Sequence, residues 1–279
     1  MCRSVSSSAN PPDRFLQTQR MLSLPLILLM RCGKVKPLLR SSLMADLEST
    51  TLDRLRLVST ATITTQLFKR GLRNAFMQGV QPLAGYRMNL VGPAFTLRNI
   101  PAREDVDNVT VFTNPEHPQR KAIEITPAGH VLVIDCRGDT RAACAGQILV
   151  TRLQMRGVLG LVADGGIRDA GPIGEMDFSV YCAGPSAPLN LAQHHAVESN
   201  VPIGCGGVAV YPGDIIVGDR DGVAVIPYAM ADEVARDAAE QEALEEFLLE
   251  RVKAGAALAG TYPPNDATKA AFETWRKNR

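Results

Sequence analysis

The stretch LGLVADGGIRDAGPI, residues 159–173, joins an apolar run to a polar end. The run is short and is followed by Asp164 and two glycines, which is the pattern of a fully buried strand that ends in a turn. Directly after this turn come Arg168 and Asp169. An adjacent cation and anion at the end of a buried strand form either a salt-bridged surface turn or a site. Such a site would need a positive group for a substrate and a carboxylate for a metal.

The segments before this stretch predict a parallel pair of strands. Residues 130–136, HVLVIDC, have the pattern of a second buried strand, and residues 140–157 have that of a helix closed by Gly157. A strand, a helix and a further strand in this order favour parallel pairing inside a buried sheet.

The rest of the chain extends this unit to an α/β fold with a mixed sheet. Further strands are predicted at 89–100, with a Gly-Pro break, at 178–184, and at 208–227, with a hairpin turn at 219–222. Helices are predicted at 50–58, at 59–72 with Ser59 or Thr60 as N-cap, and at 230–255. We divide the chain into a leader at 1–43, one α/β domain at 44–255 and a C-terminal tail at 256–279.

Charge separates the leader from the domain. Residues 1–43 contain seven basic residues and one acidic residue, which leaves 23 basic and 28 acidic residues in the rest of the chain. The mildly acidic body gives no support for nucleic-acid binding. The apolar run at 22–30 is too short for a bilayer, which needs about 20 residues, so no membrane span is predicted. The leader has features of a secretory signal and of a transit peptide. Translation from Met44 is the favoured interpretation, and we expect a cytoplasmic protein.

Three other patterns have structural interpretations. The six cysteines form no CxxC pair, and the four in the body are predicted to be buried, reduced thiols. GCGGVA at 204–209 formally fits a dinucleotide fingerprint but runs into a strand rather than a helix, so its glycines indicate close backbone packing. His194 and His195 would point about 100° apart on a helix and are predicted to be surface or interface residues.

A binding site is predicted at the head of the 140–157 helix. Gly146 lies in a small-residue turn there, and the backbone N–H groups of Gln147, Ile148 and Leu149 are expected to be free for an anion. A guanidinium beside such amides suits a carboxylate or an enolate oxygen. An adjacent carboxylate suits a hard divalent cation.

Three motifs resemble those of the RraA-like family, in the same order. They are VGPAFTLR at 91–98, GQILVTRLQMRGVLGLVADGGIRD at 146–169 and YPGDIIVGDRDGVAVIP at 211–227. The resemblance covers most of residues 50–228. The family includes divalent-metal-dependent 4-hydroxy-4-methyl-2-oxoglutarate aldolases and RraA regulators that bind ribonuclease E. The resemblance implies a swivelling β/β/α domain, with a mixed sheet and flanking helices, that assembles as a homotrimer or hexamer.

The resemblance also implies residue roles. Asp169 would be the direct protein ligand of Mg²⁺ or Mn²⁺, and Arg168 would hold the keto oxygen that becomes the enolate. Residues 146–149 would bind the carboxylate of a pyruvyl group. The aldolases carry an acid 21 residues before the arginine, where this chain has Gln147. Asp139 is a candidate substitute at the same end of the sheet.

We therefore predict a metal-dependent carbon–carbon lyase that cleaves a 4-hydroxy-2-oxo acid and decarboxylates oxaloacetate as a side reaction. The alternative is a non-catalytic RraA-like regulator of a ribonuclease or helicase partner, which Asp169 argues against and Gln147 favours. A third hypothesis is an enzyme of the same fold with a different sugar-acid-derived substrate. Its selectivity would lie in the polar segment 99–118, for which a solvated loop is the simpler interpretation.

Overall fold

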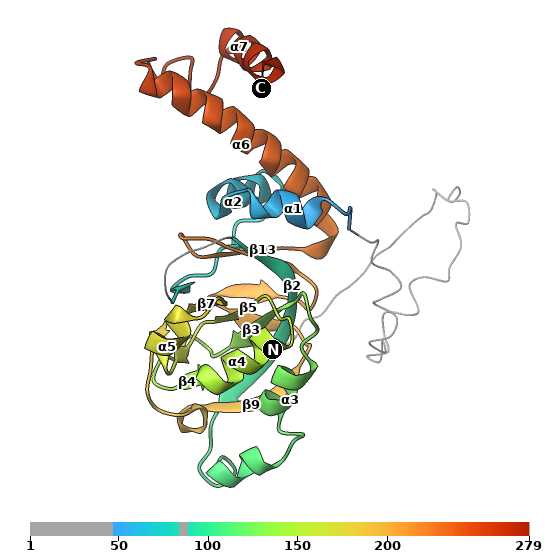
Figure 1. The fold of residues 1–279 in the computed structure, drawn as a ribbon, viewed down its shortest axis with the longest axis vertical. Helices are drawn as coiled ribbons and strands as arrows, with labels where there is room; N and C mark the ends of the chain where they lie inside the picture. Colours follow the sequence, from blue (N-terminus) through green and yellow to red (C-terminus); the bar gives the residue numbers. More distant parts are fainter. Residues whose placement is uncertain (1–46, 84–88, 279) are drawn as a thin grey trace, which may run out of the picture. The chain divides into compact units, whose positions relative to one another are not determined.

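The computed structural model describes residues 47–83 and 89–278 (Figure 1). The leader and the expected translation start at Met44 lie outside these residues. Within the described ranges, no helix has both the length and the apolar character that a bilayer span requires.

A mixed eight-stranded sheet forms the centre of the fold, as predicted. The parallel pairs are β2–β3, β3–β5 and β5–β7, and the antiparallel pairs are β1–β7, β2–β12, β12–β13 and β2–β9. The predicted parallel pair at 131–164 is therefore confirmed. The strands are β1 (Gln81–Pro82), β2 (Leu90–Pro101), β3 (Val131–Asp135), β5 (Gly160–Ala163), β7 (Ser179–Cys182), β9 (His194–Ser199), β12 (Ile215–Gly218) and β13 (Val223–Ile226).

The strand β2 runs for 12 residues through the Gly-Pro pair where a break was predicted. Pro93 pairs with Ile215 at the end of the β12 register, and the β3 register begins at Ala94. Proline lacks the N–H that a central ladder uses. It fits here because β2 pairs with β3 only from Ala94 onward, so Pro93 lies outside that ladder.

Two small sheets complete the strands. The parallel strands β4 (Ala143–Ala145), β6 (Gly166–Ile167) and β8 (Gly184–Pro185) form one of them. The other is the hairpin of β10 (Ile203–Cys205) and β11 (Val208–Val210). Its turn residue Gly206 has φ +55°, and a Cβ there would lie 2.7 Å from the Met77 Cβ, so close packing explains this glycine.

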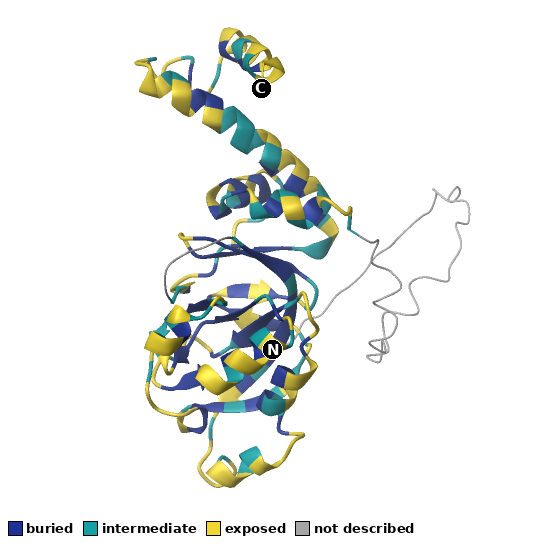
Figure 2. Ribbon diagram, viewed as in Figure 1, coloured by how far each residue is buried: buried dark blue, intermediate teal, exposed yellow. Residues whose placement is uncertain are grey.

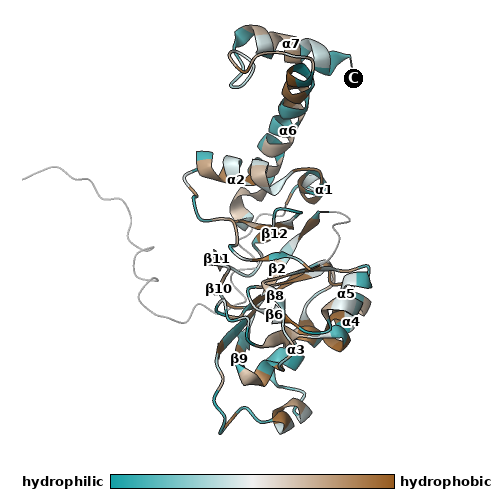
Figure 3. Cartoon of the chain, turned by 90° about the vertical axis from the view of Figure 1, so that its left-hand side faces the viewer, coloured by the Kyte–Doolittle hydropathy of each residue, from teal (hydrophilic) through white to brown (hydrophobic). Residues whose placement is uncertain are grey.

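Helices cover one face of the central sheet (Figure 1), and the β10–β11 hairpin covers the other (Figure 3). The strand β3 contributes Leu132 and Ile134 to the first core and Val131 and Val133 to the second, because successive side chains of a strand alternate between faces. The covering helices are α3 (Pro118–Ile125), α4 (Gln147–Met155) and α5 (Ala170–Glu175). Figure 2 shows the resulting buried strands and half-exposed helices.

A third core lies where three helices pack on β12 and β13. They are α1 (Thr51–Arg56), α2 (Thr60–Lys69) and α6 (Ala231–Lys253), and Ile215, Val217 and Ile226 face them. Ser59 is the N-cap of α2, since its side chain accepts the Thr62 N–H at 3.1 Å. This settles the choice between Ser59 and Thr60.

The C-terminal tail contains the helix α7 (Asp266–Lys277), which packs on the end of α6. Phe247 and Leu248 of α6 meet Phe272 of α7, and the indole Nε1–H of Trp275 donates to the Glu250 carboxylate at 2.9 Å. Figure 3 shows hydrophobic and hydrophilic residues alternating along α6, which is the amphipathic pattern that its sequence predicted.

The body cysteines are free thiols, as predicted. All four are buried: Cys136, Cys144, Cys182 and Cys205. Burial raises the pKa of the Cys182 thiol to about 11.

Candidate active site

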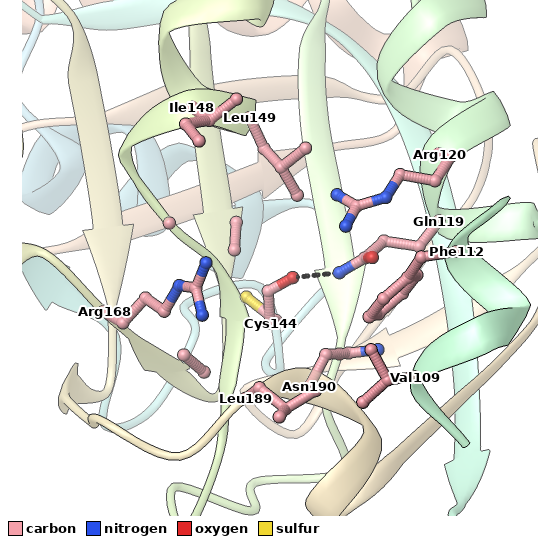
Figure 4. A pocket seen from close by; sticks show the side chains of 13 residues that line it. Val109, Phe112, Gln119, Arg120, Cys144, Ile148, Leu149, Arg168, Leu189 and Asn190 are labelled. Carbon is pink, nitrogen blue, oxygen red and sulfur yellow. Dashed lines mark hydrogen bonds between the residues drawn. The ribbon is translucent and has the colours of Figure 1, made fainter. Parts of the chain in front are cut away.

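A cavity of about 490 Å³ opens beside the first turn of α4 (Figure 4). Its walls come from α3, β4, α4 and the single-turn helices η3 (Val109–Thr113) and η4 (Asn190–Ala192), together with Arg168. This volume lies in the range of small-molecule sites. The lining residues are Val109, Phe112, Gln119, Arg120, Ala143, Cys144, Ala145, Gly146, Ile148, Leu149, Arg168, Leu189 and Asn190.

The small sheet places the Arg-Asp pair against the α4 terminus. The strand β6 runs parallel to β4, so Ile167 pairs with Ala145, and the Arg168 N–H donates to the Ala145 carbonyl at 3.1 Å. The next residue, Asp169, has left-handed backbone angles, φ 57° and ψ 38°. About half of each side chain is exposed, and Arg168 Nε lies 3.7 Å from Asp169 Oδ2. The pair is therefore partly exposed and is not a buried ion pair. Arg168 lines the cavity, whereas Asp169 is not among its lining residues and lies beside Arg168 at the α4 terminus.

Gly146 is the N-cap of α4, and any side chain there would displace Arg168 and Asp169 from their positions. A Cβ there would lie 2.6 Å from Arg168 Nε and 2.8 Å from Asp169 Oδ2. The missing side chain lets the pair approach the helix start.

The three α4 amides differ in their hydrogen bonding. The Gln147 N–H donates to Asp169 Oδ2 at 3.0 Å, and the Leu149 N–H turns back to the Gly146 carbonyl at 3.0 Å. The Ile148 N–H has no partner within the described ranges. The expectation of three free amides is thus wrong for two of them. Asp169 itself satisfies one, as anions commonly do at a helix N-terminus.

Gln147, at the position where the aldolases have an acid, does not line the cavity, and neither does Asp139, the candidate substitute. The Gln147 side chain is exposed. The Asp139 carboxylate pairs with Arg141, at 3.0 Å to Nε and 2.6 Å to Nη2, and these hydrogen bonds lower its pKa to about 2. No group of three or more His, Cys, Asp or Glu side chains gathers in a metal-binding arrangement in the described part of the chain.

Sequence reasoning missed the wall opposite Arg168. Phe112 of η3 and Arg120 of α3 lie there, with the Arg120 guanidinium 4.2 Å from the Phe112 ring centre (Figure 4). Because Val109 and Phe112 line the cavity, segment 99–118 is more than the solvated loop of the simpler interpretation. The sequence does not mark Arg120 as a site residue, because a charged residue on a short helix is common.

The two adjacent histidines lie in a strand, β9, rather than on a helix. His194 is fully buried, so its prediction as a surface or interface residue is wrong. Its Nε2 lies 3.4 Å from the Ala142 carbonyl, and burial is the main cause that lowers its pKa. His195 is half-buried, with Nδ1 2.7 Å from a carboxylate oxygen of Asp107.

These features define a class of protein: an α/β domain in which a helix start and an arginine, itself followed by an aspartate, line a ligand-sized cavity. Residues 60–225 match the RraA-like family, described as aldolase/RraA, and the chain belongs to that family. The predicted swivelling β/β/α fold, with its mixed sheet and flanking helices, is confirmed.

Individual relatives carry two kinds of name. A "Putative 4-hydroxy-4-methyl-2-oxoglutarate aldolase" of Halalkalibacterium halodurans is 35% identical over 158 residues, which cover 56% of this chain and 69% of the relative. A protein of the same name from Ectopseudomonas mendocina is 31% identical over 112 residues, 40% of this chain and 68% of the relative. The solved structure of Streptomyces coelicolor RraAS2, described as an unusual member of the RNase ES inhibitor RraA family, is 30% identical. It covers 73% of this chain and 97% of its own, with a TM-score of 0.65.

Proposed function

We propose that the cavity is the active site of a divalent-metal-dependent lyase that cleaves a 4-hydroxy-2-oxo acid. The observation that carries this proposal is the position of Arg168 in the cavity wall, next to Asp169 and the α4 terminus. The names of the aldolase relatives support the reaction type.

The donor set suits Mg²⁺ or Mn²⁺. Asp169 offers one hard carboxylate at the solvent side, and its Oδ1 accepts no hydrogen bond from the described residues. Mg²⁺ is commonly held by one or two carboxylates, with water and substrate oxygens completing its shell. When bound at Asp169, such an ion would supply positive charge to polarise the keto group of the substrate.

The chain's own groups would act on the pyruvyl end of the substrate. Arg168 would hydrogen-bond the keto oxygen, whose negative charge grows as the carbon–carbon bond breaks and an enolate forms. The Ile148 N–H would bind a carboxylate oxygen at the α4 terminus. Leu149 and Leu189 would exclude water from this end of the cavity, which strengthens both interactions.

A turnover assay with and without chelator tests this proposal. The full chain is incubated with oxaloacetate and with 4-hydroxy-4-methyl-2-oxoglutarate, and pyruvate release is measured. We expect no release in EDTA and full activity after Mg²⁺ or Mn²⁺ is added back. Undiminished turnover of the chelated protein would contradict metal dependence.

The second candidate function is the non-catalytic regulator. Gln147, which stands where the aldolases have an acid, favours it, and so does the likeness to RraAS2. No pyruvate release from either substrate at any metal concentration would support the regulator. Under either function, we expect the protein to be a homotrimer or hexamer, and analytical ultracentrifugation can measure this oligomeric state.

A further inference from the structure

The cavity contains a second guanidinium besides Arg168. Arg120 projects from α3 into the wall opposite Arg168 (Figure 4). Its pKa is lowered by burial and, to a smaller extent, by the positive charge of Arg168. No carboxylate pairs with Arg120 in residues 47–83 and 89–278. A half-buried cation without an anion is energetically unfavourable, so this wall is suited to an anionic ligand.

The Arg120 side chain is held in position by its neighbours. The Phe112 ring packs beneath the guanidinium at 4.2 Å, and η3 presents this ring from a different segment of the chain. A cation stacked on a ring keeps its in-plane N–H groups free for a carboxylate.

The residue before Arg120 adds an unmatched acceptor to the same wall. Gln119 is 3% exposed and lines the cavity, and its Nε2–H donates to the Cys144 carbonyl at 2.6 Å. This hydrogen bond fixes the amide, and its Oε1 is buried and has no donor among the residues that the structure describes. Buried acceptors in native proteins nearly always have a partner. A ligand hydroxyl would supply one.

We propose that Arg120 and Gln119 form a specificity subsite for the distal end of the substrate, opposite the pyruvyl end at Arg168. Arg120 binds a second carboxylate, and Gln119 Oε1 accepts the hydrogen of a hydroxyl. This inference rests on the proposed function and assigns the residues that would select a substrate with a second carboxylate and a hydroxyl. Both residues are specificity determinants, and neither moves a proton in the reaction.

A binding experiment tests Arg120 without requiring turnover. Two ligands of equal chain length, 2-oxoglutarate and 2-oxopentanoate, differ only in the distal carboxylate. Their affinities are measured by isothermal titration calorimetry in buffer containing Mg²⁺, for the wild-type protein and for Arg120→Gln. Lys121→Gln is the matched control, because it removes a positive charge one residue further along α3, where Lys121 is exposed and pairs with Glu116.

The expected result is selective. Wild type prefers 2-oxoglutarate by about 10- to 100-fold, the range of a charge-assisted hydrogen-bonded pair. Arg120→Gln removes most of this preference, and Lys121→Gln keeps it. Equal weakening of both ligands by Arg120→Gln, or no preference in the wild type, would overturn the subsite. Circular dichroism confirms that each variant is folded.

A kinetic comparison tests Gln119. Oxaloacetate and 4-hydroxy-2-oxoglutarate are both dicarboxylates, but only the second has a hydroxyl. We expect Gln119→Met to lower kcat/KM for 4-hydroxy-2-oxoglutarate at least tenfold more than for oxaloacetate. An equal loss for both would assign Gln119 a merely structural role. If the protein turns over neither substrate, the lyase proposal fails, whereas the binding preference still decides on Arg120.

Discussion

Asp169 accepts a hydrogen bond from the α4 terminus and is also the residue that we propose as metal ligand. Its left-handed backbone is unfavourable for most residues by about 1–2 kcal/mol, although aspartate and asparagine tolerate it better than others. One carboxylate oxygen caps the Gln147 amide, and the other accepts no hydrogen bond from the described residues on a side chain that is about half exposed. A structural contact therefore orients the residue that we propose as metal ligand.

Substitutions of Asp169 and Arg168 are expected to have different effects, the first on metal affinity and the second on turnover. Asp169→Asn keeps a residue that tolerates the left-handed region, so the fold survives, but the neutral amide binds a cation weakly. The Mg²⁺ concentration for half-maximal oxaloacetate decarboxylation should rise steeply. Arg168→Gln should leave that concentration within a few-fold and lower turnover by about 100- to 1,000-fold, as the loss of one oxyanion donor does. Identical metal titration curves for the two variants would contradict these separate roles.

Gln147→Asp tests whether a second acid is missing. A carboxylate at the first position of α4 would lie next to Asp169, whose oxygen already accepts the Gln147 N–H. We expect half-maximal activity at a lower Mg²⁺ concentration. Thr151→Asp is the control, because it adds the same charge to an exposed position one turn further along α4. If both variants shift the titration equally, the effect is general electrostatics, and Asp139 becomes the next carboxylate to test.

At the scale of elements, periodicity predicted the long segments and missed the short ones. Parallel strands β3 and β5 were predictable because they are continuous apolar runs. The strand β4 lies inside the segment 140–157 that the sequence predicts as one helix, because three small residues carry no period, and the helix α4 covers only Gln147–Met155. Its existence depends on β6, which pairs with it across the 20 residues that separate the two strands.

The residues of the candidate site also fall into two groups, those that the sequence pattern predicts and those that it does not. Gly146, Ile148, Leu149 and Arg168 line the cavity, and their spacing around one helix and strand made them predictable. Arg120 and Phe112 were not predictable, because only the packing of α3 and η3 on the sheet brings them opposite Arg168. Local patterns in the sequence do not encode such nonlocal contacts.

His194 in β9 should make stability depend on pH. Burial and the charge of Arg137 lower its pKa, whereas the Ala142 carbonyl, Asp139 and Asp164 raise it by less. The unfolded chain therefore takes up the proton first as pH falls below about 6.5. Stability is full above this pH and decreases below it, by at most about 1.4 kcal/mol per pH unit for one proton.

The measurement is the free energy of unfolding in urea between pH 8 and pH 5. His194→Gln should show a smaller decrease than wild type, and the control His130→Gln, at a partly exposed position, should behave like wild type. Parallel curves for wild type and His194→Gln would contradict the assignment.

At the scale of the whole molecule, the leader is expected to be dispensable. Residues 46–279 form one compact unit with its own cores, and the leader differs from it in charge and pattern. A chain lacking residues 1–43 should keep the melting temperature and the oxaloacetate activity of the full chain. Insolubility or inactivity of the shortened protein would refute this prediction.

The contact between α6 and α7 also determines what a spectroscopist can see. Trp275 is the single tryptophan of the chain, and its ring stacks on Phe272 at 5.9 Å within a cluster separate from the other cores. Tryptophan emission therefore reports the detachment of α7, whereas far-ultraviolet circular dichroism reports the sheet and most helices. Small clusters open at lower free energy than large cores. We expect the emission to change at a lower urea concentration than the dichroism, and coincident transitions would show that the terminal helix and the α/β domain unfold as one unit.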